Sequence, residues 1–312
     1  MEAFTKDEAM LLLSCAEIPI INDFVNYWFI RTSGGDNFEN FYFGNYVAIG
    51  WDEFDDLNML KEVSHDTLKN QIENIYPEDT KPGSAASQIQ RFVNEVKIGD
   101  YILIPGTNCD RIAFGVITSD VFLYEPTEQD KLDAIFDGIE PAFLKRRNVA
   151  WFADGPFTRN ELDPLLLPII YSYGTIVNAN PYSDFINRTL YNSYYRDGQL
   201  HSIFNVTKRK NIQAYDLCSF INTIFESLDI YSKLMDCEVD HKELSIKASI
   251  NSPGPIEIIT AATSIFIVLS SISLLLNGAK VKFSFNIFNI ASGEVNIDSP
   301  GLLEKNTKAT TE

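Results

Sequence analysis

The residues from Tyr46 to Leu57, YVAIGWDEFDDL, join a large aromatic ring to a dense group of carboxylates. A short strand-forming run reaches Gly50, Trp51 follows it, and the next five residues hold four acids, Asp52, Glu53, Asp55 and Asp56. A flat ring offers a face for stacking, and a carboxylate accepts hydrogen bonds from donor groups. A buried strand has no need of this arrangement, whereas the mouth of a pocket does, so the pattern favours a binding module over an enzyme.

Motifs that carry enzyme chemistry are not found in the sequence. It has no glycine-rich phosphate-binding loop and no G-x-S-x-G segment, and its cysteines and histidines show no metal-ligand spacing. Glu95-Val96-Lys97 spells the E-x-K of some nucleases, but no acid precedes it at the required distance. We therefore expect no catalytic residue, no metal and no cofactor. A nuclease with an unrecognised site stays open as an alternative.

Composition limits the partners of the chain. Its 312 residues are 45% hydrophobic and 12% aromatic, which is enough for two domains with cores, and the net charge is −18. Such a charge repels long duplex DNA, because nonspecific binding depends on basic residues that neutralise phosphates. We interpret two short basic runs, 145–147 and 208–210, as solvated turns. Widely spaced cysteines and an acidic start without a basic leader region predict a protein of the reducing cytoplasm.

Hydrophobic patterning predicts a mixed α and β fold in the first two thirds of the chain. Two strong strands around the turn at 107–110 predict a hairpin, and a helical period covers 58–76. We read 125–147 as an irregular excursion. The remaining expected elements are strands at 27–30, 41–49 and 148–153 and helices at 88–96 and after Pro181.

The C-terminal third predicts a second, α/β region after a polar boundary at 196–202. We expect helices at 212–235 and 256–277 and strands at 244–250 and 281–290. Within the second helix, residues 259–276 carry no charge, a length at which a membrane span becomes a candidate. Its serines and threonines and the two flanking strands favour a helix packed on a sheet. Membrane association through 256–277 remains the alternative.

Several segments then occur in an order that resembles a known family. Arg31 ends a strand, Gly34-Gly35 follow in a loop, and VAIGW comes next at 47–51. RFVNEVKIGD at 91–100 and IAFGVI at 112–117 complete the series. Over about residues 24–180 this order resembles a PUA-like, EVE-related domain, the kind found at the N-terminus of bacterial restriction-type and other defence proteins. The C-terminal half departs from that family, because no nuclease signature follows.

The resemblance implies a small, partly open β-barrel with flanking helices and a pocket for a base flipped out of nucleic acid. Such a pocket needs flat faces for stacking and a few polar groups for the edge of the base. The candidates for the faces are Trp28, Tyr46, Trp51 and Trp151, and those for the edge are Arg31, Asp52 and Gln88. Several of them have a structural alternative: Trp28 lies in an apolar strand typical of a core, and Arg31 has nearby acids with which to pair.

Together these observations predict an α+β protein with four segments. These are an N-terminal helix in 1–23, the PUA-like barrel in 24–198, an α/β domain with a long apolar helix in 199–303, and a polar tail in 304–312. We expect the barrel to sense a modified base, a nucleotide or a short nucleic acid in anti-phage defence. The C-terminal domain then serves homo-oligomerisation or coupling to a partner protein. The alternative from another class is a membrane-acting effector that inserts the helix at 256–277.

Overall fold

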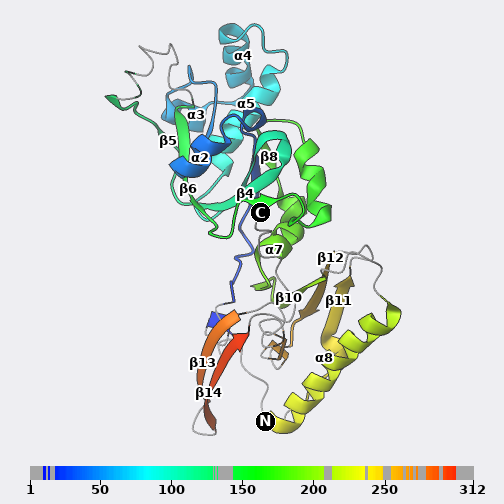
Figure 1. Ribbon diagram of the computed structural model, residues 1–312. Coiled ribbons are helices and arrows are strands. Elements are labelled where there is room, and N and C mark those ends of the chain that lie inside the picture. The colour runs from blue at the N-terminus through cyan, green and yellow to red at the C-terminus, as the bar shows by residue number, and fades with distance from the viewer. Residues whose placement is uncertain are drawn as a thin grey trace, which may run out of the picture. The chain divides into compact units, whose positions relative to one another are not determined.

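A computed structural model describes most of the chain, which divides into two compact units (Figure 1). One unit comprises Phe24–Phe185, and the other comprises Met1–Asp23 with Ile186–Glu312. The described residues are 10, 11, 13, 14, 18–128, 130, 132, 143–206, 213–235, 238–248, 254–262, 265, 266, 268, 269, 272, 279–287 and 291–299. The expected N-terminal helix falls largely outside them, with residues 10, 11, 13 and 14 helical, and the expected tail at 304–312 falls wholly outside.

The unit Phe24–Phe185 is built on an eight-stranded sheet that curls into a half-barrel (Figure 1). Its main path runs β2-β6-β4-β3-β1-β8, while β5 pairs with β6 and β7 pairs with β4. Only β1 and β3 pair in parallel among these strands of the described chain. The strands are β1 (Tyr27–Ile30), β2 (Tyr46–Ile49), β3 (Tyr101–Pro105), β4 (Arg111–Ile117), β5 (Phe122–Leu123), β6 (Lys145–Trp151), β7 (Phe157–Thr158) and β8 (Ile176–Asn178).

Helices flank this sheet, and local sequence explains where several of them begin. Asp56 caps α3 by accepting the N–H groups of Asn58 and Met59, and Ser64 caps α4 through Thr67. The α-helices of this unit are α2 (Phe38–Gly44), α3 (Leu57–Glu62), α4 (His65–Ile75) and α5 (Pro82–Gln90), while α7 (Ser183–Leu190) begins in this unit and ends in the other. A π-helical turn, η2 (Arg91–Glu95), continues α5. The 3-10 turns are η1 (Ser33–Gly35), η3 (Thr107–Cys109), η4 (Pro164–Tyr171) and η5 (Asn180–Tyr182).

A hydrophobic core lies on one face of the half-barrel sheet. Alternating residues of β1, β3 and β4 face it, and α2, α3, α4 and α5 supply its other wall, with Trp28, Ile102, Ala113, Phe41 and Ile89 among its members. The mixed α+β class and the half-barrel with flanking helices are therefore confirmed.

Three sequence-based expectations for this unit were wrong. The helical period at 58–76 is divided into α3 and α4, because Val63 and Ser64 have extended backbone and Ser64 caps a new helix. Residues 38–44 form the helix α2 and not part of a strand, because Phe38, Phe41 and Tyr42 recur at helical spacing and pack on the core. The basic run 145–147 is not a solvated turn but the start of β6. Lys145 and Arg147 are buried there at 0% and 2% exposure.

The second unit carries a four-stranded antiparallel sheet in the order β11-β12-β10-β9. Its elements are β9 (Ser193–Arg196), β10 (Gln199–Val206), α8 (Ala214–Met235), η6 (His241–Glu243), β11 (Leu244–Ala248) and β12 (Gly254–Thr260). α8 packs through Ile224 and Leu228 on an apolar cluster that includes Leu200, Phe204 and Ile258. A separate hairpin joins β13 (Ala279–Ile287) to β14 (Ala291–Ser299).

The long apolar helix expected at 256–277 is not found among the described residues. Its first five residues belong to β12, which pairs with β10 and β11, so the apolar run begins as the central strand of a sheet. Among the described residues after β12, Ile265 is the first that is helical, and Phe266 and Leu269 pack in the same cluster as α8. Within the described part of the chain, no helix combines the length and apolarity that a membrane span requires.

Candidate functional site

Trp51 follows β2, after Gly50, in a backbone conformation that tryptophan rarely adopts. Its φ is 58°, in the left-handed region, where a bulky side chain is an outlier that the surrounding contacts must hold. The carbonyl of Trp51 accepts from Nζ of Lys145 at 2.8 Å and from the N–H of Phe54 at 3.0 Å. Its half-buried ring packs against the edge of the core. The turn after β2 is thus fixed by specific bonds.

Asp52 holds the start of β6 against this turn. One carboxylate oxygen accepts the N–H of Phe143 at 2.7 Å, and the other accepts that of Leu144 at 2.9 Å. Nζ of Lys145 lies 3.6 Å from the same carboxylate. Asp52 therefore has three partners within the chain and holds the start of β6 in place.

Lys145 predicts a pH dependence of stability. Burial lowers the pKa of its ammonium below the ordinary 10.5, and the charge of Asp52 offsets part of this effect. As the pH rises toward 10.5, the unfolded chain holds the proton longer than the folded chain, so the lysine's contribution to stability rises with pH. We expect the unfolding free energy of the native protein, relative to Lys145→Met, to increase as the pH rises toward 10.5, by about 1.4 kcal/mol per unit of lowered pKa. Urea titrations at stepped pH measure it, and a flat or falling difference contradicts it.

Arg31 and Gln88 meet at the segment that leads into β8. Arg31 donates through Nη2 to the carbonyls of Ile170, at 3.0 Å, and Ser172. Its N–H donates to the carbonyl of Thr175 at 2.8 Å. Oε1 of Gln88 accepts the N–H of Thr175 and, at 3.3 Å, that of Ile176. The structure thus brings these two candidates together, whereas Asp52 bonds to Phe143 and Leu144 and the carbonyl of Trp51 bonds to Lys145.

Trp28 lies in the core of the half-barrel. It is 2% exposed, and its indole Nε1 donates to Oδ2 of Asp100 at 2.8 Å. Asp100 also accepts the N–H groups of Asn26, at 3.0 Å, and Lys97, at 2.9 Å. The contacts of Trp28 therefore fit the alternative that it is a core residue, because its indole N–H already has an acceptor in Asp100.

Trp151 differs from Trp28 in this respect. Its ring is half-buried at the end of β6, and its Nε1 is buried without a hydrogen-bond partner among the described residues. The ring of Tyr42 lies 5.6 Å away between centroids, tilted by 39°, and the Tyr42 hydroxyl donates to the carbonyl of Gly155 at 3.1 Å. Gly115 pairs with Trp151 across the strands, and a Cβ there would lie 2.7 Å from the indole ring. The glycine of the IAFGVI segment therefore makes room for Trp151.

Tyr46 takes part in a stack with a positive charge. The guanidinium of Arg146 lies 4.1 Å from the ring centroid of Tyr46 and 3.5 Å from that of Tyr124. Burial raises the pKa of Tyr46, and the charge of Arg146 opposes that shift. The sequence indicated neither Arg146 nor Tyr124, because the three residues come together only when β2, β5 and β6 pair.

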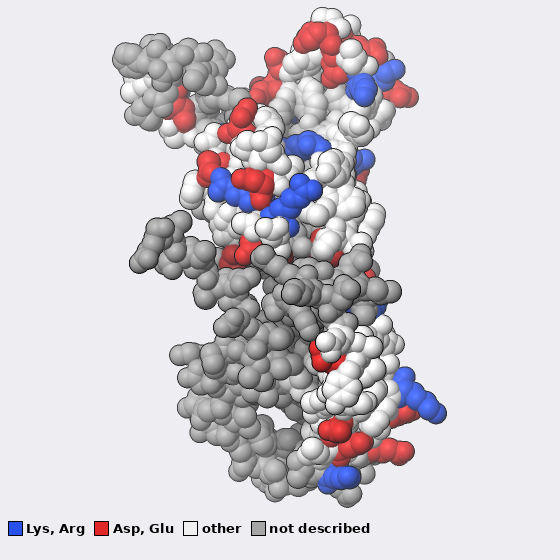
Figure 2. All heavy atoms as spheres, turned by 45° about the vertical axis from the view of Figure 1, so that its right-hand side comes forward, with Lys and Arg blue, Asp and Glu red and all other residues white. Residues whose placement is uncertain are grey.

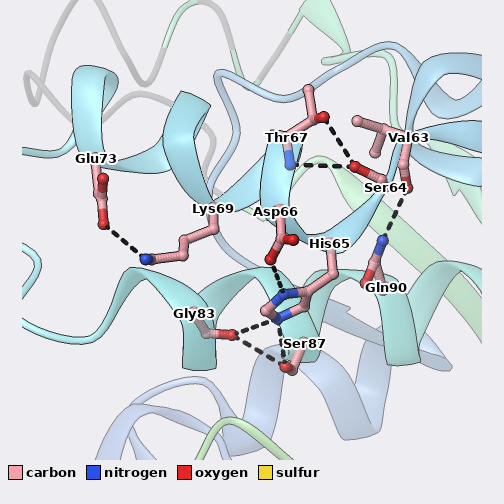
Figure 3. A network of polar contacts seen from close by, with 10 residues as sticks. All are labelled: Val63, Ser64, His65, Asp66, Thr67, Lys69, Glu73, Gly83, Ser87 and Gln90. Carbon is pink, nitrogen blue, oxygen red and sulfur yellow. Dashed lines mark hydrogen bonds and ion pairs between the residues drawn. The ribbon is translucent and has the colours of Figure 1, made fainter.

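Figure 3 shows a Ser–His–Asp arrangement between α4 and α5 that resembles a nucleophilic triad. Nε2 of His65 lies 3.0 Å from both Oγ of Ser87 and the carbonyl of Gly83, and Nδ1 lies 3.6 Å from Asp66. A carbonyl only accepts, so its bond to Nε2 places the proton on that nitrogen. Ser87 also donates to Gly83 at 3.0 Å. His65 in this state cannot take the serine proton, so the arrangement is a helix–helix contact.

A buried polar cluster in the second unit was missed by the sequence analysis, which placed residue 257 in the helix expected at 256–277. Glu257 is 0% exposed on β12. Its carboxylate lies 2.6 Å from Nδ1 of His201 and 3.3 Å from Nη1 of Arg188, and it accepts from the hydroxyl of Tyr194 at 3.2 Å. The rings of Tyr194 and His201 stack at 4.4 Å. A single acid inside the strand pattern PIEIIT is the signal that was available.

Among the described residues, no group of three or more His, Cys, Asp or Glu side chains is arranged to hold a metal ion. A family model described as a domain of unknown function, DUF8426, matches residues 29–163, which lie within the half-barrel unit. Neither the curated proteins nor the solved structures contain a match to this chain.

Proposed function

We propose that the unit Phe24–Phe185 binds a planar, base-like ligand: a modified base, a nucleotide or a short single-stranded nucleic acid. The resemblance to PUA-like, EVE-related domains supports a role in sensing during antiviral defence. We also propose that the remaining unit, which the resemblance does not cover, serves oligomerisation or partner coupling.

The indole N–H of Trp151, which has no acceptor among the described residues, carries this proposal. A buried donor without an acceptor costs about 1–3 kcal/mol, so it marks a place where a bound molecule can supply the missing acceptor. Carbonyl and ring nitrogen atoms on the edge of a base are acceptors of this kind. Tyr42 adds an aromatic face beside the indole, at 5.6 Å between centroids. Stacking on such a face contributes about 1–3 kcal/mol per base.

Surface charge narrows the class of ligand. Figure 2 shows acidic side chains interspersed with the basic ones on the visible face of the described residues. Binding to a long duplex relies on a continuous array of positive charge that neutralises phosphates. With a net charge of −18, a ligand held by one ring and a few polar contacts is favoured over a polyanion.

Trp151→Phe is the first test, since it keeps an aromatic ring and removes only the N–H and part of the ring area. We expect the variant to bind between about 5-fold and 100-fold more weakly, because the lost hydrogen bond is worth about 1–2.7 kcal/mol. Calorimetric titration with plain and methylated nucleosides, nucleotides and short single strands measures the change. The same titration of Trp51→Ala tests the face that the sequence predicts at the end of β2.

Trp28→Phe is the matched control. Its N–H is bonded internally to Asp100 at 2.8 Å, so the substitution is expected to lower stability without changing affinity. Equal affinity of the native protein and Trp151→Phe for every ligand that binds would remove Trp151 from the site. Absence of binding by the native protein to the whole panel would refute the proposed function.

A further inference from the structure

We infer that the ligand of this unit is a base with a positive charge, of the kind that methylation of a ring nitrogen produces. This inference rests on the proposed function and adds the charge class of the ligand. It starts from three rings at the Trp151 position. The ring of Tyr42 lies 5.6 Å from that of Trp151, tilted by 39°, and the ring of Phe43 lies 5.5 Å from that of Tyr42, at 69°. We call these three residues the aromatic site.

The aromatic site presents ring faces in different directions. Phe43 is 74% exposed, and Tyr42 and Trp151 are half-buried, so a molecule from solution can reach the rings. Because the planes are inclined, a flat neutral base stacks on one face only. A cation is attracted by the negative face of every ring within about 6 Å, whatever the inclination of the rings to one another. This geometry therefore favours a positively charged ligand.

The chain uses the same attraction at the other end of this row of rings. The guanidinium of Arg111 lies 4.6 Å from the ring centroid of Phe38, and Phe38 stacks on Tyr42 at 5.7 Å with an angle of 10°. Among the described residues, no lysine or arginine lies over a ring of the aromatic site. Trp151 ends β6, about 20 Å along the strand from its first residue, and every residue of the site falls in the described ranges 18–128 and 143–206.

A negative charge lies beside the aromatic site. The Tyr42 hydroxyl donates to the carbonyl of Gly155 at 3.1 Å. Gly155 closes a turn in which its N–H donates to the carbonyl of Phe152 at 3.2 Å, and Asp154 is exposed in that turn. The carboxylate of Asp154 therefore belongs to the residue next to the one that Tyr42 contacts. It attracts a cation and repels an anion, and the net charge of −18 acts in the same direction over a longer range.

A positively charged methylated base still offers the acceptor that the indole N–H of Trp151 lacks. Methylation of adenine at its N1 leaves the N3 and N7 atoms as acceptors, and methylation of cytosine at its N3 leaves the carbonyl oxygen. The positive charge of such a base is spread over the ring, so its hydration is weak and an aromatic face is a suitable partner. The hydrogen bond and the cation–ring attraction are thus made by one ligand.

The decisive experiment compares methylated nucleosides that are built from the same heavy atoms and differ in charge. At pH 7, 1-methyladenosine and 3-methylcytidine are cations, whereas N6-methyladenosine and 5-methylcytidine are neutral. In calorimetric titrations of the native protein, we expect the cation of each pair to bind about 5- to 30-fold more tightly than its neutral isomer, because of the cation–ring attraction.

Two variants assign this preference to the aromatic site. Phe43→Leu keeps an apolar side chain without a ring, and we expect the preference to fall by about 2- to 5-fold. Asp154→Asn removes the carboxylate, and we expect a fall of about twofold. Tyr173→Leu is the matched control, because Tyr173 is an aromatic residue with 96% exposure outside the aromatic site, and its preference is expected to equal that of the native protein.

Two results overturn the inference. One is equal binding of the cation and its neutral isomer by the native protein, and the other is a preference that both folded variants retain in full. If circular dichroism shows Phe43→Leu to be unfolded, Asp154→Asn decides by the same criterion. When the native protein binds both isomers equally, a loss of affinity in Trp151→Phe leaves the proposed function standing, because the indole N–H acts on both isomers alike.

Discussion

Replacing Glu257 with glutamine is expected to lower the free energy of unfolding of the second unit by about 3–5 kcal/mol. The substitution keeps the shape of the side chain and removes its charge. Arg188 then remains buried at 9% exposure opposite a neutral amide, and His201 loses an anionic partner that lies at 2.6 Å. Removing one member of a buried ion pair is costly because the other charge has already lost its water.

Two optical probes separate this effect from any change in the half-barrel. All three tryptophans lie in the unit Phe24–Phe185, so their emission in urea reports the unfolding of that unit. Far-UV circular dichroism reports both units. We expect Glu257→Gln to shift a circular dichroism transition while the emission midpoint stays in place.

Glu226→Gln on the exposed side of α8 is the control for Glu257→Gln, and its effect is expected to stay within about 0.5 kcal/mol. Arg188→Met combined with Glu257→Gln is expected to recover part of the loss, because no buried charge is then left alone. A circular dichroism transition of Glu257→Gln that coincides with that of the native protein would show that this carboxylate carries no net stabilisation.

The sequence was sufficient to predict an element wherever residues within that element determine its structure. The hairpin of β3 and β4 follows from two apolar runs around the turn at 107–109, and α4 follows from its helical period and its Ser64 cap. Asp197-Gly198 is a further local signal, a two-residue hairpin turn with both φ values positive, which the sequence analysis read as a domain boundary. The helix α2 could not be recognised in this way, because its aromatic residues also suit a strand and the core decides between the two.

The same distinction between local sequence signals and long-range contacts applies to the candidate site. The residue types at Trp51 and Asp52 were visible in the sequence, but their partners lie more than ninety positions away, at Phe143, Leu144 and Lys145. Arg146 read as part of a charged turn until β6 brought it between two tyrosines. The cluster around Glu257 depends on Arg188, sixty-nine residues earlier. Side-chain chemistry is thus predictable from a single sequence, whereas pairing across strands requires the fold.

Arg147→Met is expected to destabilise the half-barrel more than any other substitution discussed for that unit. Arg147 is 2% exposed, and burial lowers its pKa to about 10, so the guanidinium remains charged at neutral pH. Nε and Nη2 donate to the carbonyls of Phe92 and Val93, at 3.0 and 3.1 Å, and Nη1 donates to that of Ser119 at 3.2 Å. These carbonyls of η2 need donors, because carbonyls near the end of a helix lack partners within it.

Methionine occupies a similar length without any donor, so Phe92 and Val93 would keep buried carbonyls with no partner for them. Each such group costs about 1–3 kcal/mol, and we expect a total loss of about 3–5 kcal/mol for Arg147→Met. Tryptophan emission in urea measures it, since the probes lie in the same unit. Arg159→Met on the exposed surface is the matched control, and Arg147→Lys should fall between the two because it offers a charge but not the planar fork. If Arg147→Met unfolds at the same urea concentration as Arg159→Met, then water or a rearranged turn satisfies these carbonyls. The hydrogen bonds of Arg147 would then add nothing to the free energy of unfolding.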